Sequence, residues 1–239
     1  HLVIVVFEST RADVLGKRID GKPVAPNLAR VAAQGGALAP AYSHVGFTTA
    51  SLKSLFAGSL VVPPGSPSLF RELDASGYEI GVFSGQPEDF GGISAAVGMR
   101  EVADRFVDAE VLKDQRAFSF AAQGSLLVDE NIVLDRFDAA LGDAAAWETP
   151  QFVYLNFQTP HFPYHHDTVP HRFATPPLER GQIAEDNREA LERTYWNAVA
   201  HTDAALGRLI AKLETMGVWQ DTVLIVTGDH GEALFEDGF

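Results

Sequence analysis

Four short apolar runs rich in β-branched residues recur along the chain and are separated by segments of helical or loop character. The runs are Leu2–Phe7, Tyr78–Phe83, Phe152–Phe157 and Thr222–Thr227. Continuous apolar runs of this length are typical of strands covered on both faces, as in mainly parallel sheets. Their alternation with helices predicts an α/β fold, in which a mainly parallel central sheet is flanked by helices on both faces.

Helical signals fill the segments between these runs. Pro26 at a first turn and the pair Gly35-Gly36 after it predict a helix with a proline start and a glycine stop. In Asn187–Met216, apolar residues recur at steps of three and four, which predicts one long amphipathic helix ending at Gly217. A further helix is predicted over Asp129–Ala145.

The chain has 239 residues, of which 46% are apolar, so it can bury a large core. No internal repeat or linker divides it, and we predict a single domain over residues 1–239. The stretches Val61–Pro67 and Pro160–Pro177 are predicted to be long loops, which on α/β sheets usually carry function. The chain starts directly on a predicted strand and stops just after a motif, so we expect a fragment truncated at both ends.

Composition excludes several classes of function. The 18 basic and 32 acidic residues give a net charge of −14, which argues against a nucleic-acid partner. The absence of cysteine excludes disulfides and thiolate ligands, so any metal must bind through Asp, Glu, His or hydroxyl groups. The longest apolar run is far shorter than the roughly 20 residues that span a bilayer. Any membrane or targeting segment is therefore expected outside these residues.

Residues that can carry chemistry follow three of the predicted strands: Glu8, His161, and the pair Asp229-His230. Ligands of open α/β sheets bind beyond the carboxyl ends of the strands, so these residues can meet at one edge. A charged Asp229 directly after an apolar strand costs desolvation free energy unless a cation lies nearby, which favours a metal site. The simpler alternatives are that Glu8 opens a helix and that Asp229-His230 belongs to a capped turn.

Hydroxyl side chains gather in the segment Gly46–Leu52, at the predicted start of a helix that runs to Ala57. One of them can serve simply as an N-cap. The alternative is a nucleophile at a helix N-terminus, where unpaired amides and the helix dipole favour a bound phosphate or sulfate. An alcohol attacks well near neutral pH when a divalent metal stabilises its deprotonated form.

Taken in order, these motifs resemble the sulfatase-like branch of the alkaline phosphatase superfamily. The resemblance rests on motifs spread across nearly the whole chain: Ile4–Asp13, Ala25–Leu28, Ala41–Ser51 and Thr227–Glu232. Within that branch the chain is most similar to the phosphoethanolamine and phosphoglycerol transferases of the lipoteichoic acid synthase type.

The resemblance implies a site. The Gly-x-Thr-x-x-Ser pattern of those transferases falls on Gly46, Thr48 and Ser51, which makes Thr48 the metal-bound nucleophile, with Thr49 as the register alternative and a substrate contact. The implied metal ligands are Glu8, Thr48, Asp229 and His230, and His161 is implied as the catalytic histidine on the substrate side. Such a donor set suits one zinc or manganese ion better than magnesium or calcium.

Departures from the family are equally informative. Sulfatases carry a Cys/Ser-x-Pro-x-Arg pattern whose first residue becomes formylglycine, and Thr48 cannot form that aldehyde. Gram-negative transferases usually carry disulfides near this site, and this chain has no cysteine. His165, His166 and His171 have no counterpart in the resemblance, and we expect them on a solvated loop.

The resemblance thus implies metal-dependent transfer or hydrolysis of a phosphoester through a covalent threonine intermediate. The expected enzyme resembles an extracytoplasmic phosphoethanolamine or phosphoglycerol transferase, in the periplasm or at the cell surface, anchored by a membrane segment outside this chain. Its expected partner is a phosphoester linked to lipid or glycan, and not nucleic acid. The alternatives are a sulfatase-family phosphodiesterase or sulfuric ester hydrolase, and a degenerate member without catalysis.

Overall fold

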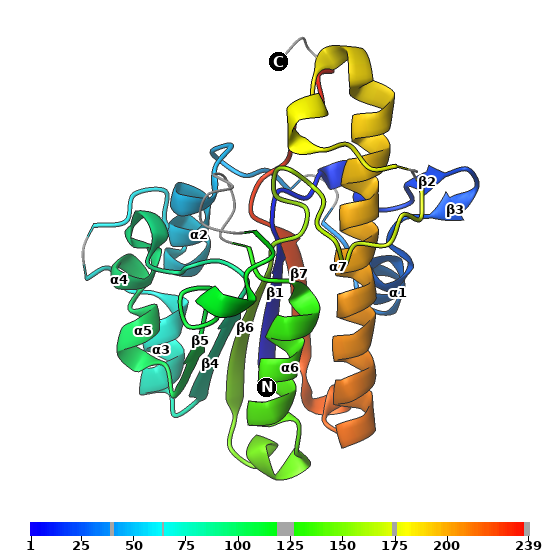
Figure 1. Cartoon of the computed structure of the whole chain (residues 1–239). Coiled ribbons are helices and arrows are strands. Elements are labelled where there is room, and N and C mark those ends of the chain that lie inside the picture. The colour runs from blue at the N-terminus through cyan, green and yellow to red at the C-terminus, as the bar shows by residue number, and fades with distance from the viewer. Residues whose placement is uncertain (39–40, 64, 119–126, 174–175, 237–239) are drawn as a thin grey trace.

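The computed structural model of the protein describes residues 1–38, 41–63, 65–118, 127–173 and 176–236. Its centre is a 5-stranded sheet in the order β5-β4-β6-β1-β7, and every strand pair in it is parallel (Figure 1). This arrangement confirms the predicted α/β fold with a mainly parallel sheet. The strands are β1 (Leu2–Phe7), β4 (Glu79–Ser84), β5 (Arg105–Val107), β6 (Gln151–Phe157) and β7 (Val223–Gly228), and a separate hairpin joins β2 (Arg18–Ile19) and β3 (Lys22–Pro23).

Helices cover the two faces of the sheet in separate groups. The helices are α1 (Pro26–Gln34), α2 (Thr48–Ala57), α3 (Leu69–Ala75), α4 (Ile93–Val97), α5 (Met99–Val102), α6 (Glu130–Leu141) and α7 (Arg188–Met216). Val3, Val5 and Phe7 of β1 pack into a core shared with α6 and α7, whereas Ile4 and Val6 pack into a core shared with α2 to α5. The alternation of side chains along β1 therefore feeds both cores, and the strand is buried on both faces.

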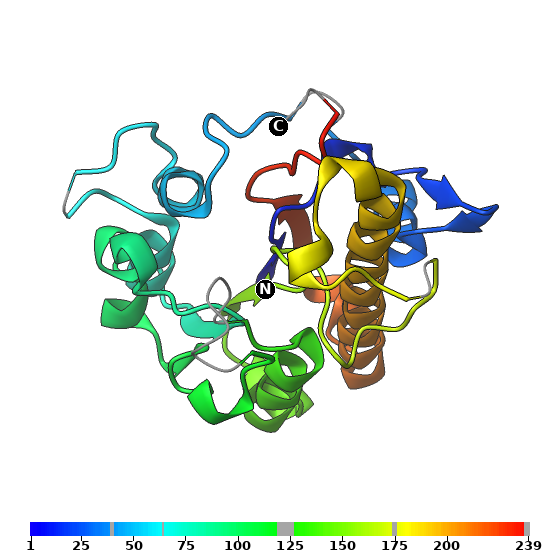
Figure 2. The same cartoon turned by 45° about the horizontal axis from the view of Figure 1, so that its top comes forward.

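Strand register decides which residues meet at the carboxyl edge of the sheet. Phe7, the last residue of β1, pairs with Phe157 on one side and with Gly228 on the other. The next residue of each strand therefore emerges at the same level. Figure 2 shows this edge lying between α2 and the long helix α7.

The amino-terminal half of α7 extends past the sheet and builds a third apolar cluster beside that edge. Tyr195 and Trp196 of this half are fully buried against loop residues that include Val14 and Tyr164. Farther along α7, the buried Asp203 accepts hydrogen bonds from two backbone amides of the first turn of α1, at 2.8 and 3.1 Å. Because α1 has no capping side chain of its own, Asp203 supplies that cap from a neighbouring helix.

The predicted strands match β1, β4, β6 and β7 to within one residue at each end. Expected burial on both faces is wrong for β7, an edge strand on which Val223 is 61% and Ile225 44% exposed. The helix predicted over Asp129–Ala145 ends at Leu141, and a short 3-10 helix follows at Ala144–Trp147.

The two long loops predicted from the sequence contain no helix or strand where the structure describes them, while residues 64, 174 and 175 within them lie outside the described residues. Within the described ranges, no helix combines the length and the apolar character needed to cross a bilayer.

Candidate metal centre and active site

Glu8, Asp229 and His230 meet where β1 and β7 end. His230 Nε2 lies 3.4 Å from Glu8 Oε1 and 3.4 Å from Asp229 Oδ2. Each of the three residues offers one ligand atom, and these atoms lie within 4.8 Å of one another. The parallel register of the two strands produces this convergence, because Phe7 and Gly228 are paired and the next residues stand side by side.

Thr48, the first residue of α2, completes the group. Its Oγ1 donates to Glu8 Oε1 at 2.8 Å and lies 3.3 Å from His230 Nε2. Ligand atoms around a tetrahedral ion with bonds of about 2.0 to 2.1 Å are about 3.3 Å apart. The measured separations of 2.8 to 3.4 Å match such an edge length, so the four side chains are spaced as metal ligands are.

A tight turn after β1 holds the carboxylates in place. Ser9 adopts a left-handed backbone conformation, with φ of 50°, and its amide donates to Asp229 Oδ1 at 2.9 Å. The Tyr195 hydroxyl donates to the Ser9 carbonyl at 2.9 Å and accepts from the Arg11 amide at 3.0 Å. A positive φ at a non-glycine residue costs about 1 kcal/mol or more and persists only where neighbours impose it, as Tyr195 does here.

Contacts from other elements fix the remaining oxygen atoms. Gln158, directly after β6, donates from Nε2 to Glu8 Oε2 at 3.1 Å. The Ser51 hydroxyl of α2 donates to the Asp229 carbonyl and ties that helix to the end of β7. At Gly228, a Cβ atom would lie 2.8 Å from the Thr10 carbonyl oxygen, so only glycine fits between the two segments.

The electrostatics of the group favour a bound cation. Burial, followed by the charge of Glu8, raises the pKa of Asp229 to about 7. Burial opposes protonation of His230, but contacts with Glu8 and Asp229 raise its pKa to about 9. Burial would raise the pKa of Glu8, but the contacts with His230, His161 and Thr48 together outweigh it and lower the pKa below 4.5.

One oxygen atom of the group still needs a partner. Asp229 Oδ2 is buried and, among the described residues, accepts no hydrogen bond. A buried carboxylate oxygen without a partner is costly, and a cation bound there would remove that cost. The residues present therefore fit a divalent metal ion.

Two predicted residues stand outside the ligand group. His161 lies near enough to lower the pKa of Glu8, and its Nδ1 is 2.8 Å from the Phe162 carbonyl oxygen. Thr49 instead lies against Gly91, where an added Cβ atom would come within 2.3 Å of the Thr49 methyl group. The structure thus brings Thr48, rather than Thr49, to the other ligands.

The prediction for the loop histidines is wrong for His166. Its side chain is buried, and it contacts the hydroxyls of Thr159 and Thr168 at 3.0 and 2.9 Å. Sequence reasoning also missed Gln158 and Tyr195, which position the site. Gln158 could have been found as the residue that follows β6, in the same place as Glu8 after β1.

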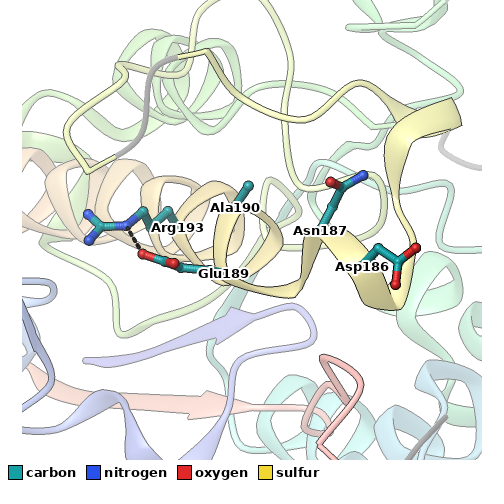
Figure 3. Close-up of a pocket in the computed structure, with 5 residues that line it drawn as sticks. All are labelled: Asp186, Asn187, Glu189, Ala190 and Arg193. Atoms are coloured by element: carbon teal, nitrogen blue, oxygen red, sulfur yellow. Dashed lines mark ion pairs between the residues drawn. The ribbon is translucent and has the colours of Figure 1, made fainter.

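Two surface hollows are lined by described residues, and only the second has a lining residue next to the candidate metal ligands. One of about 270 Å³ at the start of α7 is lined by Asp186, Asn187, Glu189, Ala190 and Arg193 (Figure 3). It holds a Glu189–Arg193 ion pair and none of the predicted site residues. The other, of about 400 Å³, is lined by Arg11, Ala12, Asp13, Gly231 and Glu232 and therefore borders His230.

Comparison with models of known protein families shows to which family the chain belongs. The model of the family described as Sulfatase matches residues 1–239. The chain belongs to the sulfatase family. Among the relatives of this sulfatase-family chain, the ulvan-active sulfatase of Formosa agariphila is 29% identical over 96 residues, which cover 36% of the chain and 18% of that protein.

Solved structures share the fold of this sulfatase-family chain. The lipoteichoic acid synthase LtaP from Listeria monocytogenes superposes with a TM-score of 0.76 at 18% identity, over 99% of the chain and 57% of LtaP. The C-terminal periplasmic domain of EptC from Escherichia coli, in complex with Zn, gives a TM-score of 0.70 at 16% identity, over 99% of the chain and 65% of that domain. The match to the Sulfatase family model confirms the predicted sulfatase-like branch. The chain spans less than two thirds of each of these proteins.

Proposed function

We propose that the protein is a metal-dependent enzyme that transfers or hydrolyses a phosphoester through a covalent intermediate on Thr48. The observation that carries this proposal is the position of Thr48 Oγ1, 2.8 Å from Glu8 Oε1 and 3.3 Å from His230 Nε2 at the start of α2. A threonine that served only as a helix cap would hydrogen-bond to an amide of its own helix. Thr48 instead points to the carboxylate and the imidazole.

Glu8, Thr48, Asp229 and His230 would hold one divalent ion. Their two carboxylates, one hydroxyl and one imidazole suit zinc or manganese, and EptC, which shares the fold, is known in complex with Zn. When bound, the ion would supply positive charge that lowers the pKa of the Thr48 hydroxyl and offsets the charge of the phosphate.

In the first half of the reaction, Thr48 Oγ1 forms a bond to phosphorus while the bond from phosphorus to the leaving alcohol breaks. Glu8 Oε1 accepts the hydrogen bond of this hydroxyl, so Glu8 orients it and takes up its proton as the bond to phosphorus forms. The first-turn amides of α2 face outward from the amino-terminal end of the helix, and Phe47, the residue before the helix, offers them no capping side chain. These amides and the helix dipole stabilise the phosphate oxygens.

His161 is proposed to give a proton to the leaving alcohol. The Phe162 carbonyl can only accept a hydrogen bond, so Nδ1 keeps its proton throughout. The proton given to the leaving alcohol is the one on Nε2 of the doubly protonated ring, which is left neutral. In the second half, an acceptor alcohol or water attacks phosphorus and gives its proton to Nε2 of the same histidine. The bond from phosphorus to Thr48 Oγ1 breaks, and Thr48 takes its proton back from Glu8. Transfer and hydrolysis thus use the same residues and differ in the acceptor.

The substrate class follows from the same proposal. We expect a phosphoethanolamine or phosphoglycerol ester linked to lipid or glycan, and an enzyme that works outside the cytoplasm. The fold shared with LtaP and with the periplasmic domain of EptC supports this expectation. Thr48 stands where sulfatases need a residue that becomes formylglycine, which argues against sulfate esters.

Turnover of three chromogenic esters tests the proposal: bis(p-nitrophenyl) phosphate, p-nitrophenyl phosphate and p-nitrophenyl sulfate. With zinc or manganese present, we expect the phosphodiester to be cleaved, and Thr48→Ala to lose at least a thousandfold in kcat. The matched variant Thr49→Ala should keep substantial activity because Thr49 faces Gly91. Preferential cleavage of the sulfate, or full activity of Thr48→Ala, would overturn the proposal.

A further inference from the structure

A second group of titratable side chains lies at the start of α6, beside α7 and the segment that follows β6. It consists of Asp129, Glu130, His166 and His201, and all four are buried. Asp129 caps the start of α6 by accepting from the Asn131 amide at 2.7 Å, and Glu130 is the first residue of that helix. His201 comes from α7 and His166 from the loop after β6, so the group joins three separate parts of the fold.

The spacing of these side chains matches that of metal ligands. His201 Nε2 lies 3.0 Å from Asp129 Oδ2 and 3.6 Å from Glu130 Oε2, and His166 Nδ1 lies 3.9 Å from Asp129 Oδ2. One ligand atom from each residue falls within 4.8 Å of all the others. These distances bracket the roughly 3.3 Å expected between ligands of a tetrahedral ion.

The charge of the group is unbalanced without a cation. Two adjacent carboxylates are buried together, with side-chain exposures of 7% for Asp129 and 0% for Glu130. No lysine or arginine in the described residues forms an ion pair with either of them, so the only nearby bases are the two imidazoles. One protonated imidazole leaves a buried net charge of −1, whereas two neutral imidazoles and a divalent ion give zero.

Hydroxyl groups around the cluster would keep the ligands oriented. Thr159 Oγ1 contacts Glu130 and lies 3.0 Å from His166 Nε2, while Thr168 Oγ1 contacts Asp129 and lies 2.9 Å from His166 Nδ1. Whichever nitrogen of His166 binds the ion, the other therefore keeps a partner. This is the outer-shell arrangement typical of ligating histidines.

We propose that Asp129, Glu130, His166 and His201 bind a second divalent transition-metal ion, with zinc the best match to two imidazoles and two carboxylates. Four buried protein ligands fill a tetrahedral ion's coordination and leave no position for substrate, so the role of this ion is to join α6, α7 and the loop after β6. The site shares no residue with the group at Glu8.

Counting bound zinc tests the proposal without any measurement of activity. The purified protein is stripped with a chelator, dialysed against micromolar zinc, and analysed by elemental mass spectrometry. We expect about two zinc ions per chain in the wild type, and one in the double variant Glu8→Gln/Asp229→Asn, which removes ligands of the first group alone. Zero zinc in that double variant would overturn the proposal even if no variant of the second group folds.

The complementary variant is His166→Gln/His201→Gln, which should lose one zinc ion and keep the one at Glu8. His171→Gln is the matched control, because this exposed histidine of the same loop contacts none of the four ligands, and it should keep both ions. A wild-type count of one that falls to zero in Glu8→Gln/Asp229→Asn would leave the proposed function standing and refute the second site. A count of one that stays in that variant would refute the metal group of the proposed function instead.

Discussion

Glu88 offers a prediction whose size follows from the structure. Its side chain is fully buried in the loop that follows β4, and burial raises its pKa from 4.5 to about 7. Four donors contact the same oxygen, Oε1: Ser84 at 2.6 Å, Tyr154 at 3.2 Å, Gln86 at 3.3 Å and Asn156 at 3.4 Å. The other oxygen, Oε2, has no hydrogen-bond partner among the described residues. A glutamine can therefore keep all four hydrogen bonds and cannot ionise.

The sign of the pH dependence follows from proton binding. Between pH 4.5 and 7 the folded protein keeps the Glu88 proton and the unfolded chain loses it, so stability falls as pH rises through this range. The shift corresponds to about 3 kcal/mol of unfolding free energy, fully expressed above pH 7. Glu88→Gln removes this loss. We compare the free energy of unfolding of Glu88→Gln with that of the wild type. When the pH is raised from 4.5 to 8, this difference should shift by about 3 kcal/mol in favour of the variant.

Urea unfolding followed by circular dichroism at the two pH values measures this difference. Burying the NH2 group of the new glutamine costs the same free energy at both pH values, so this cost cancels in the comparison. Glu72→Gln removes an exposed carboxylate of α3 and serves as the control, with no comparable change expected. An equal effect of Glu88→Gln at both pH values would refute the reasoning.

Two further substitutions probe how the fold supports the site. Asp203→Ala leaves the first turn of α1 without its cap and should lower the free energy of unfolding by about 1 to 3 kcal/mol, measured by urea unfolding at neutral pH; no loss would show that water replaces the carboxylate. Gly228→Ala places a Cβ atom 2.8 Å from the Thr10 carbonyl and should weaken zinc binding at the neighbouring Asp229 by tenfold or more in a competitive chelator titration. Gly36→Ala, where nothing lies within 4 Å, should leave zinc affinity unchanged; equal effects of the two would contradict the account.

The strands that carry the site could be predicted from the sequence because buried parallel strands are apolar throughout. The short strand β5 and the helices α3 to α5 could not, since each is seven residues or fewer and none has a long periodic pattern. The sequence also does not show that β7 is an edge strand with one side exposed. Val223 and Ile225 have the same composition as buried strand residues, and only sheet order shows that this strand is at the edge.

The convergence of Glu8, Asp229 and His230 was predictable because parallel strands end at one edge of the sheet. Burial of His166 was not, because it depends on where a loop of irregular backbone packs against α6 and α7. The sequence predicts that a helix starts at Asp129 and Glu130. Nothing in the local sequence indicates that His201, on α7, lies 3.0 Å from Asp129. Pairings between distant segments depend on tertiary packing rather than on local pattern.

The covalent role of Thr48 is the central claim, and direct trapping tests it most sharply. The protein is mixed with bis(p-nitrophenyl) phosphate and metal, quenched in acid, digested, and analysed by mass spectrometry. We expect a p-nitrophenyl phosphate adduct on Thr48 in the wild type and in Thr49→Ala, and no adduct in Thr48→Ala. An adduct on Thr49 would show that the register is wrong by one residue, and turnover without an adduct on either threonine would contradict the covalent mechanism and leave water as the attacking group.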